Sequence, residues 1–172
     1  MARTRTLWMP TLAAALVAVL LGTEQAATSA VEPRLTTESI MIPAGAFIPT
    51  ENSDYFNYGE YLAVASGSSA FTTPLSFPVA IVNIKRITLY AYDNTATASA
   101  CVWLYRSRPV DGTEDDAGQV CTTDNALRQA VYTTTIDPRR ANTALQGPYL
   151  WVTVSGPDVK LYGVKINYSY QR

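Results

Sequence analysis

The sequence predicts an all-β protein: a single antiparallel β-sandwich of jelly-roll or Greek-key type with one disulfide. Short apolar or alternating runs recur from Ile40 onward, with turn residues between them, and this is the pattern of a sandwich or barrel. No window of about eleven residues has a convincing helical period. The only cysteines, Cys101 and Cys121, form an even pair, which predicts one structural bridge.

The N-terminal region has the order of a secretory signal peptide. Two arginines precede an apolar run over residues 7–21, and small and polar residues follow, as in segments that direct export and are then removed. The run is shorter than the roughly 20 residues that span a bilayer. We therefore expect a secreted, extracellular protein with no transmembrane segment in the mature chain. The expected parts are a signal peptide (1–30), a loose leader (31–39) and the β-sandwich domain (40–172).

Composition excludes several classes of function. The chain of 172 residues has 13 Lys and Arg against 14 Asp and Glu, a net charge of −1. Such a balance gives no electrostatic basis for binding nucleic acid or an anionic membrane surface. Histidine is absent, which removes Ser-His and Cys-His nucleophile pairs and nearly every zinc site. We therefore expect a protein that is not an enzyme and has no cofactor.

Ten short segments are rich in β-branched and aromatic residues and are bounded by Gly, Pro, Asn or Asp. The strand candidates are residues 39–42, 46–49, 61–65, 70–76, 79–92, 98–106, 118–123, 130–136, 149–155 and 159–170. The longest early candidate, 79–92, changes phase: Val82 and Ile84 share one face, whereas Ile87 and Leu89 have the other parity. A β-bulge or a strand break at residues 85–86 would restore one apolar face.

The two cysteines predict an antiparallel hairpin. If Cys101 faces Cys121, the chain folds back at Asp111, where Asp-Gly is a strong turn signal. The same register sets Val102 opposite Val120. A second hairpin is predicted at the C-terminus, with Pro157 at the turn between 149–155 and 159–170.

Three segments resemble uncharacterised exported bacterial all-β proteins. These are Leu-Tyr-Ala-Tyr-Asp-Asn (89–94), Val-Trp-Leu-Tyr-Arg (102–106) and Leu-Tyr-Gly-Val-Lys-Ile-Asn-Tyr (161–168). The resemblance implies a β-sandwich and bacterial export. It implies no activity and assigns no functional residue.

Residues 55–61 concentrate four aromatic side chains in seven positions. Aromatic platforms with neighbouring Asn and Glu stack on sugar rings and bind their hydroxyl groups. The alternative is that alternate rings face the core and the others line a sheet edge. The candidate ligand-binding residues are Tyr55, Phe56, Asn57, Tyr58, Glu60 and Tyr61.

A cluster of acidic residues is expected in the loop of the cysteine hairpin: Asp111, Glu114, Asp115 and Asp116. Carboxylate oxygens bind Ca²⁺ without histidine, so these residues are a candidate Ca²⁺ site. Their order does not fit an EF-hand, and a solvated loop is the interpretation we prefer.

The sequence favours a non-catalytic protein that serves in structure, assembly or surface interaction. Its partner would be a second copy of the chain, as a homo-oligomer, or a surface glycan. A carbohydrate-binding module that uses residues 55–61 is the first alternative. An acidic-residue hydrolase is the second, since a glycosidase needs only two carboxylates across a cleft; its scattered candidates are Glu51, Glu60, Asp93 and Asp124.

Overall fold

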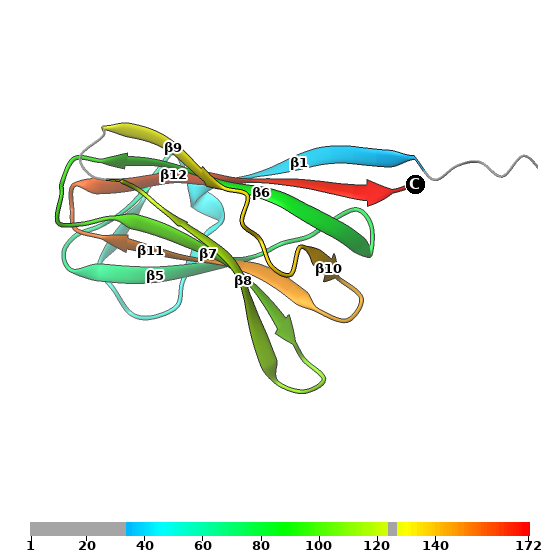
Figure 1. The fold of residues 1–172 in the computed structure, drawn as a ribbon. Coiled ribbons are helices and arrows are strands. Elements are labelled where there is room, and N and C mark those ends of the chain that lie inside the picture. Colours follow the sequence, from blue (N-terminus) through cyan, green and yellow to red (C-terminus); the bar gives the residue numbers. More distant parts are fainter. Residues whose placement is uncertain (1–33, 124–126) are drawn as a thin grey trace, which may run out of the picture. The chain divides into compact units, whose positions relative to one another are not determined.

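The computed structural model describes residues 34–123 and 127–172, which form two antiparallel β-sheets (Figure 1). The predicted signal peptide lies outside these residues. In chain order the elements are β1 (Leu35–Pro43), the 3-10 turn η1 (Ala44–Ala46), β2 (Ile48–Pro49), β3 (Tyr55–Asn57), β4 (Leu62–Val64), β5 (Ser68–Pro74), β6 (Ile81–Asp93), β7 (Ala100–Arg108), β8 (Thr113–Cys121), β9 (Arg128–Thr133), β10 (Arg140–Asn142), β11 (Gly147–Ser155) and β12 (Val159–Gln171). Within the described ranges, no helix has the length and apolar character needed to cross a membrane.

The strand order is that of a jelly roll. The seven-stranded sheet has the order β10-β6-β12-β4-β3, with β1 also beside β12 and β9 also beside β6. The five-stranded sheet has the order β2-β5-β11-β7-β8. If β4 to β9, β11 and β12 are numbered as eight strands, the two sheets read 1-8-3-6 and 2-7-4-5, which is the jelly-roll arrangement. The predicted fold class is confirmed.

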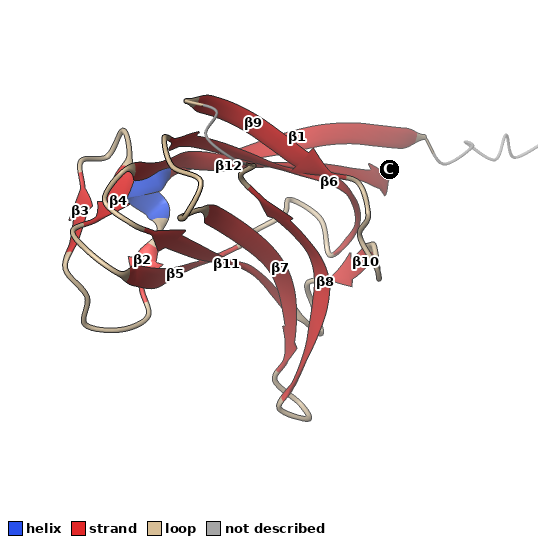
Figure 2. Cartoon of the chain, turned by 60° about the vertical axis from the view of Figure 1, so that its left-hand side comes forward, coloured by secondary structure: helices blue, strands red, loops and turns tan. Residues whose placement is uncertain are grey.

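The two sheets form two layers (Figure 2), and the core fills the space between their inner faces. Alternate residues of each long strand point inward, so period-two apolar runs from both sheets meet in one cluster. Its largest fully buried side chains are Phe71, Leu62, Ile84, Ile87, Leu89, Leu104, Leu150, Leu161, Ile166, Val64, Val82 and Val102.

The predicted bulge in β6 is confirmed. Asn167 of β12 pairs with Arg86, and the next residue, Tyr168, pairs with Ile84. Lys85 is therefore the extra residue. Because of this bulge, Ile84 and Ile87 are both buried although they differ in parity.

The cysteine hairpin is also confirmed. Cys101 pairs with Cys121 across β7 and β8, and the two form a disulfide that joins residues 20 positions apart. Val102 pairs with Val120 as predicted. The placement of the acidic cluster in a loop is wrong for three of its four residues. Glu114, Asp115 and Asp116 belong to β8, because ladder pairing continues past a register shift up to Arg108 and Thr113.

The loose leader predicted for residues 31–39 is wrong from Leu35 onward. β1 pairs with β12 along its whole length, from Leu35 opposite Gln171 to Pro43 opposite Gly163. Burial alternates along β1, because one of its faces is open to solvent.

The predicted C-terminal hairpin is wrong. β11 pairs with β5 and β7, whereas β12 pairs with β1, β4 and β6 in the other sheet. The turn at Pro157 thus connects the two layers. The inward-facing residues Leu150, Val152 and Val164 are buried as predicted, because alternation places them in the core in either arrangement.

Candidate functional site

The aromatic segment forms β3 and the turn that leads into β4. Tyr55 points inward, and its ring meets the edge of the fully buried Phe71 ring at a centroid distance of 5.4 Å. Phe56, the next residue along the strand, points to the other face and is 48% exposed. The alternation of a strand therefore divides the segment, with Tyr55 supporting the core and Phe56 facing solvent.

Three rings gather on this outer side: Phe56, Tyr58 and Tyr61, here called the aromatic cluster. The Phe56 and Tyr58 rings are stacked at 6.0 Å with an interplanar angle of 20°. The Tyr58 and Tyr61 rings are 4.9 Å apart with an angle of 42°. Tyr58 is the most open of them, at 61% exposure.

A tight turn fixes these rings relative to one another. The backbone N–H of Tyr58 donates to the carbonyl of Tyr61 at 3.0 Å. The N–H of Gly59 donates to the side-chain carbonyl oxygen of Asn57, also at 3.0 Å, and Gly59 adopts a φ of 79° that favours glycine. The turn therefore uses Asn57, one of the polar residues predicted to contact a ligand. Glu60 is exposed beside the rings.

The ladder pairing of the seven-stranded sheet extends this surface. Phe56 pairs with Ala63, Ala63 with Lys160, Lys160 with Tyr92, and Tyr92 with Arg128. Residues paired directly across neighbouring strands project from the same face of a sheet. These five residues, here called the cross-sheet row, therefore lie on one outer face.

Lys160 joins the aromatic cluster to the rest of the row. Its Nζ lies 4.7 Å from the centroid of the Tyr61 ring and 5.6 Å from that of Tyr92. Both are within the range of cation–π attraction. Sequence reasoning missed Lys160, Tyr92 and Arg128, because only the strand register brings them to residues 55–61.

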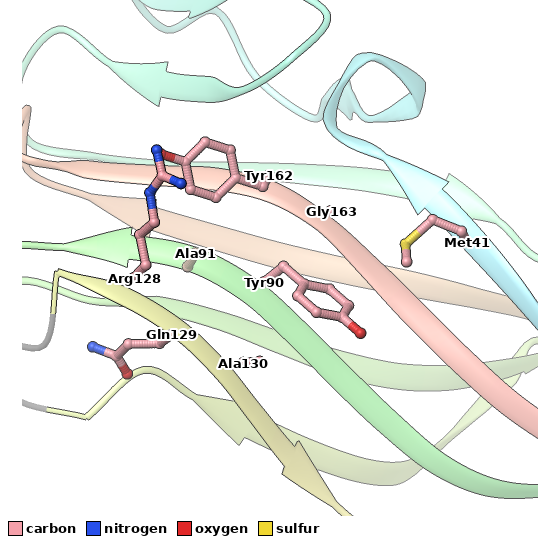
Figure 3. Close-up of a pocket in the computed structure, with 8 residues that line it drawn as sticks. All are labelled: Met41, Tyr90, Ala91, Arg128, Gln129, Ala130, Tyr162 and Gly163. Carbon is pink, nitrogen blue, oxygen red and sulfur yellow. The ribbon is translucent and has the colours of Figure 1, made fainter.

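A shallow groove of about 510 Å³ opens on the same face. Figure 3 shows Tyr162 and Arg128 at one end, Met41 at the other and Tyr90 between them. Gly163 lines the groove, and the neighbouring strand β1 lies so close to it that a Cβ atom would be 2.5 Å from the carbonyl oxygen of Ile42.

The four acidic residues proposed for Ca²⁺ are each bound within the protein. Thr113 donates to Asp111 through its hydroxyl and its N–H, and these bonds lower the pKa of the Asp111 carboxyl. Asp115 accepts from two arginines, Arg106 at 2.9 Å and Arg108 at 2.6 Å. The remaining two act separately: the Tyr149 hydroxyl donates to Glu114, and the N–H of Gly118 donates to Asp116.

No group of three or more Asp, Glu, His or Cys side chains in the described residues could hold a metal ion. Successive residues of β8 also point to opposite faces, so Asp115 lies on the other side of the hairpin from Glu114 and Asp116.

The acids of the hydrolase alternative are not brought together as a pair. Asp93 is 1% exposed and accepts from the hydroxyl of Thr122 at 2.5 Å. Glu51 and Glu60 lie in exposed loops. Asp124 lies outside the described residues.

The outer face of the five-stranded sheet holds a second aromatic group that sequence reasoning missed. Trp103 pairs with Trp151, and Tyr105 pairs with Tyr149, across β7 and β11. The two tyrosine rings are stacked at 5.5 Å. Burial, followed by the hydrogen bond to Glu114, raises the pKa of Tyr149. We call these four residues the tryptophan face.

Comparison with known proteins gives structural neighbours only. No family model matches the chain, and no curated protein matches it significantly. One similar structure is the CBM36-1 domain of a multidomain xylanase from the hindgut metagenome of Trinervitermes trinervoides, with 10% identity, 76% of this chain and 96% of that chain covered, and a TM-score of 0.46. A second is the C-terminal CBM6 of a marine laminarinase from Zobellia galactanivorans, with 12% identity, 75% and 98% coverage, and a TM-score of 0.48.

A third is the carbohydrate-binding module CBM36 in complex with calcium and xylotriose, with 12% identity, 76% and 98% coverage, and a TM-score of 0.43. At these values no ligand and no binding residue is transferred to this chain.

Proposed function

We propose that this protein is a non-catalytic carbohydrate-binding β-sandwich and that the aromatic cluster is its binding surface. The observation that carries the proposal is the set of three rings held outside the core by a hydrogen-bonded turn. Rings in this position stack on the apolar faces of sugars, and the hydroxyl groups of the two tyrosines bond to sugar hydroxyls.

The exposure of these rings supports binding over a purely structural role. Phe56 and Tyr58 are 48% and 61% exposed, and contiguous exposed apolar surface marks interaction sites more often than scattered residues do. The Tyr55 ring of the same segment packs against Phe71 in the core. The outward rings therefore remain accessible to a ligand.

The proposed setting is the cell exterior, after export through the N-terminal segment. A disulfide between Cys101 and Cys121 fits an oxidising compartment. We propose a surface glycan as the partner. A homo-oligomer and the candidate Ca²⁺ site, both left open by the sequence, stay hypotheses.

Glycan-array screening followed by titration calorimetry with the best soluble oligosaccharide tests this function. We expect Tyr58→Ala to weaken binding by about tenfold, the value of one good aromatic contact. Tyr132→Ala is the matched control, because Tyr132 is 59% exposed against 61% for Tyr58. Tyr132 also lies away from the proposed site, four residues or about 13 Å along β9 from Arg128, the end of the cross-sheet row.

These measurements test the assignment of the binding site and the proposed function separately. If Trp103→Ala abolishes binding while Tyr58→Ala has no effect, the tryptophan face is the site and our assignment is wrong. If no glycan binds the folded wild-type protein, the function itself is wrong. Release of reducing ends during incubation with the ligand would instead favour the hydrolase alternative.

A further inference from the structure

The cross-sheet row is long enough to contact an extended chain molecule. It crosses five strands, from Phe56 on β3 to Arg128 on β9. Four steps between neighbouring strands, each of about 4.8 Å, amount to roughly 19 Å. The groove lined by Tyr162 and Tyr90 lies beside the Arg128 end of this row (Figure 3).

Two cations of the row have no carboxylate partner in the described part of the chain. Both ion pairs found in residues 34–123 and 127–172 involve Asp115 and the arginines Arg106 and Arg108. Lys160 contacts ring faces, and Arg128 lines the groove. Both side chains project from the outer face of the sheet, where an anionic group on a bound molecule can approach them.

Four strands of the seven-stranded sheet have outward charges of one sign, and the exposed Glu60 beside the aromatic cluster lies in a loop outside them. The outward side chains of the described strands β1, β6, β9 and β12 include several cations and no carboxylate, since Glu38 and Asp93 point inward. The cations at regular outward positions are Arg86, Arg128, Lys160 and Lys165. The opposite outer face holds Glu114 and Asp116 beside Tyr105.

This sign is a local property. The whole chain has a net charge of −1, so the positive potential of this face does not follow from a generally basic composition. A face whose charges share one sign raises the local concentration of ligands of the other sign.

The balance of rings and charges favours a sugar chain over a nucleic acid. Tight nucleic-acid binding rests on roughly six to ten phosphate contacts. The row and the aromatic cluster instead combine two cations, Lys160 and Arg128, with the rings of Phe56, Tyr58, Tyr61 and Tyr92. Ring stacking therefore supplies the larger part of the binding free energy. The two cations select ligands that have anionic groups.

We propose that the ligand of this face is an acidic polysaccharide, whose sugar rings stack on the aromatic cluster while its anionic groups bind Lys160 and Arg128. This inference rests on the proposed carbohydrate-binding function and specifies its ligand class. The anionic groups are carboxylates or sulfates, because both are recognised by the same side chains.

The test compares polygalacturonate with its fully methyl-esterified form, which has the same backbone without the charges. Heparin and a single-stranded oligothymidylate of equal charge are the further probes. We expect calorimetry at an ionic strength of about 0.1 M to show tighter binding of polygalacturonate or heparin than of the ester. Lys160→Gln and Arg128→Gln should each reduce this preference by about fivefold, as expected for one exposed ion pair.

Arg86→Gln is the matched control. Arg86 is exposed on the same face, but its guanidinium stacks on Tyr132, 4.5 Å from the ring centroid, at a distance from the row. Its removal should leave the preference nearly unchanged, because the field at the row is screened within a Debye length of about 10 Å. Circular dichroism of each variant confirms that it is folded.

Several results would overturn the inference. One is equal affinity for polygalacturonate, heparin and the ester, and another is tighter binding of the oligothymidylate than of any polysaccharide. A loss of preference in Arg86→Gln as large as that in Lys160→Gln would show general charge attraction without a site. If Tyr58→Ala abolishes binding of the ester while Lys160→Gln and Arg128→Gln change nothing, the proposed function stands and only the acidic ligand class fails.

Discussion

At the scale of single residues, Gly163 and Glu38 hold β1 against β12. Any Cβ atom at Gly163 would collide with the backbone of Ile42, so glycine is required for the close approach of β1 to β12 beside the groove. Glu38 accepts hydrogen bonds from the hydroxyl groups of Tyr168 at 2.9 Å and Tyr170 at 2.8 Å. The sequence offered no signal for either role, because both depend on a strand pairing between distant ends of the chain.

The Glu38 contacts predict a pH-dependent stability. The two tyrosine hydroxyls lower the pKa of the Glu38 carboxyl below its usual value of 4.5. A carboxyl with a lower pKa in the folded state stabilises the protein above its unfolded-state pKa, and this contribution is lost as the pH falls through the folded-state pKa. We expect the Tm of the wild type to fall more steeply than that of Glu38→Gln between about pH 5 and pH 3.

The contact between Glu38 and Tyr168 also predicts a change of stability in a second pH range, at alkaline pH. Burial, followed by the bond to Glu38, raises the pKa of Tyr168 from its usual value of 10.0 to about 12. The contribution of the neutral Tyr168 hydroxyl to the stability of the fold is therefore complete below the unfolded-state pKa. It is lost as the pH rises through the folded-state pKa. Thermal unfolding followed by circular dichroism measures both windows, with Glu51→Gln as an exposed control. Parallel pH profiles for Glu38→Gln and wild type would contradict the assignment.

At the scale of elements, sequence patterns predicted what lies within one strand or one local pair. The phase change in β6 located its bulge, and the Cys101–Cys121 pair predicted the β7–β8 register as far as Leu104 and Gly118, beyond which the pairing shifts by one residue. The same patterns could not assign β11 and β12 to different sheets, because inward alternation is identical for strands that pair and for strands that face each other. β3 was missed because a three-residue strand is too short for a periodic signal.

Removal of the disulfide should destabilise the β7–β8 hairpin. Closure of a loop with a sequence separation of 20 contributes about 3 kcal/mol in the chain-entropy model. We expect Cys101→Ser to lower the Tm by about 10 °C, because about 1 kcal/mol shifts the Tm of a domain of this size by roughly 4 °C. Calorimetry of oxidised and reduced wild type is the parallel measurement, and identical Tm values would refute the expectation.

The same hairpin contains a buried cation whose partner can be changed. Arg106 has a side chain that is 4% exposed and donates to Asp115, which is 29% exposed. Asp115→Asn would leave this charge without a counter-ion, and we expect a loss on the order of 2 kcal/mol, less than for a fully buried pair. Asp116→Asn is the control, since among the described residues the Asp116 side chain accepts from the Gly118 N–H alone. Urea unfolding that ranks the two variants equally would disprove this role of Arg106.

At the scale of the whole molecule, the candidate site is assembled from residues that lie far apart in the sequence. The density of aromatics in residues 55–61 was visible in advance. Which rings are exposed, and the presence of Lys160 and Arg128 beside them, required the register of five strands. The jelly roll also gives the protein two outer faces of opposite charge, each with aromatic side chains. Which ligands the protein binds therefore depends on which of the two faces contacts the ligand.

Export is the prediction that belongs to the whole chain. We expect expression of the full-length chain in a bacterial host to yield a processed protein outside the cytoplasm, cleaved near Ala27 or Ala30 after small residues. Intact-mass spectrometry of the purified product measures the cleavage site, and Leu16→Asp, which interrupts the apolar run, is the control. An unprocessed cytoplasmic product would refute the prediction.

The antiparallel pairing of β1 with β12 brings both ends of the described chain to one place. Leu35 pairs with Gln171, and the N–H of Arg172 donates to the carbonyl of Arg34 at 3.1 Å. Lys160, the second residue of the same strand, lies near its other end, about 36 Å away along β12. A short linker could therefore join residues 172 and 34 in a circular permutant, and a dye or solid support attached there would leave the aromatic end unobstructed.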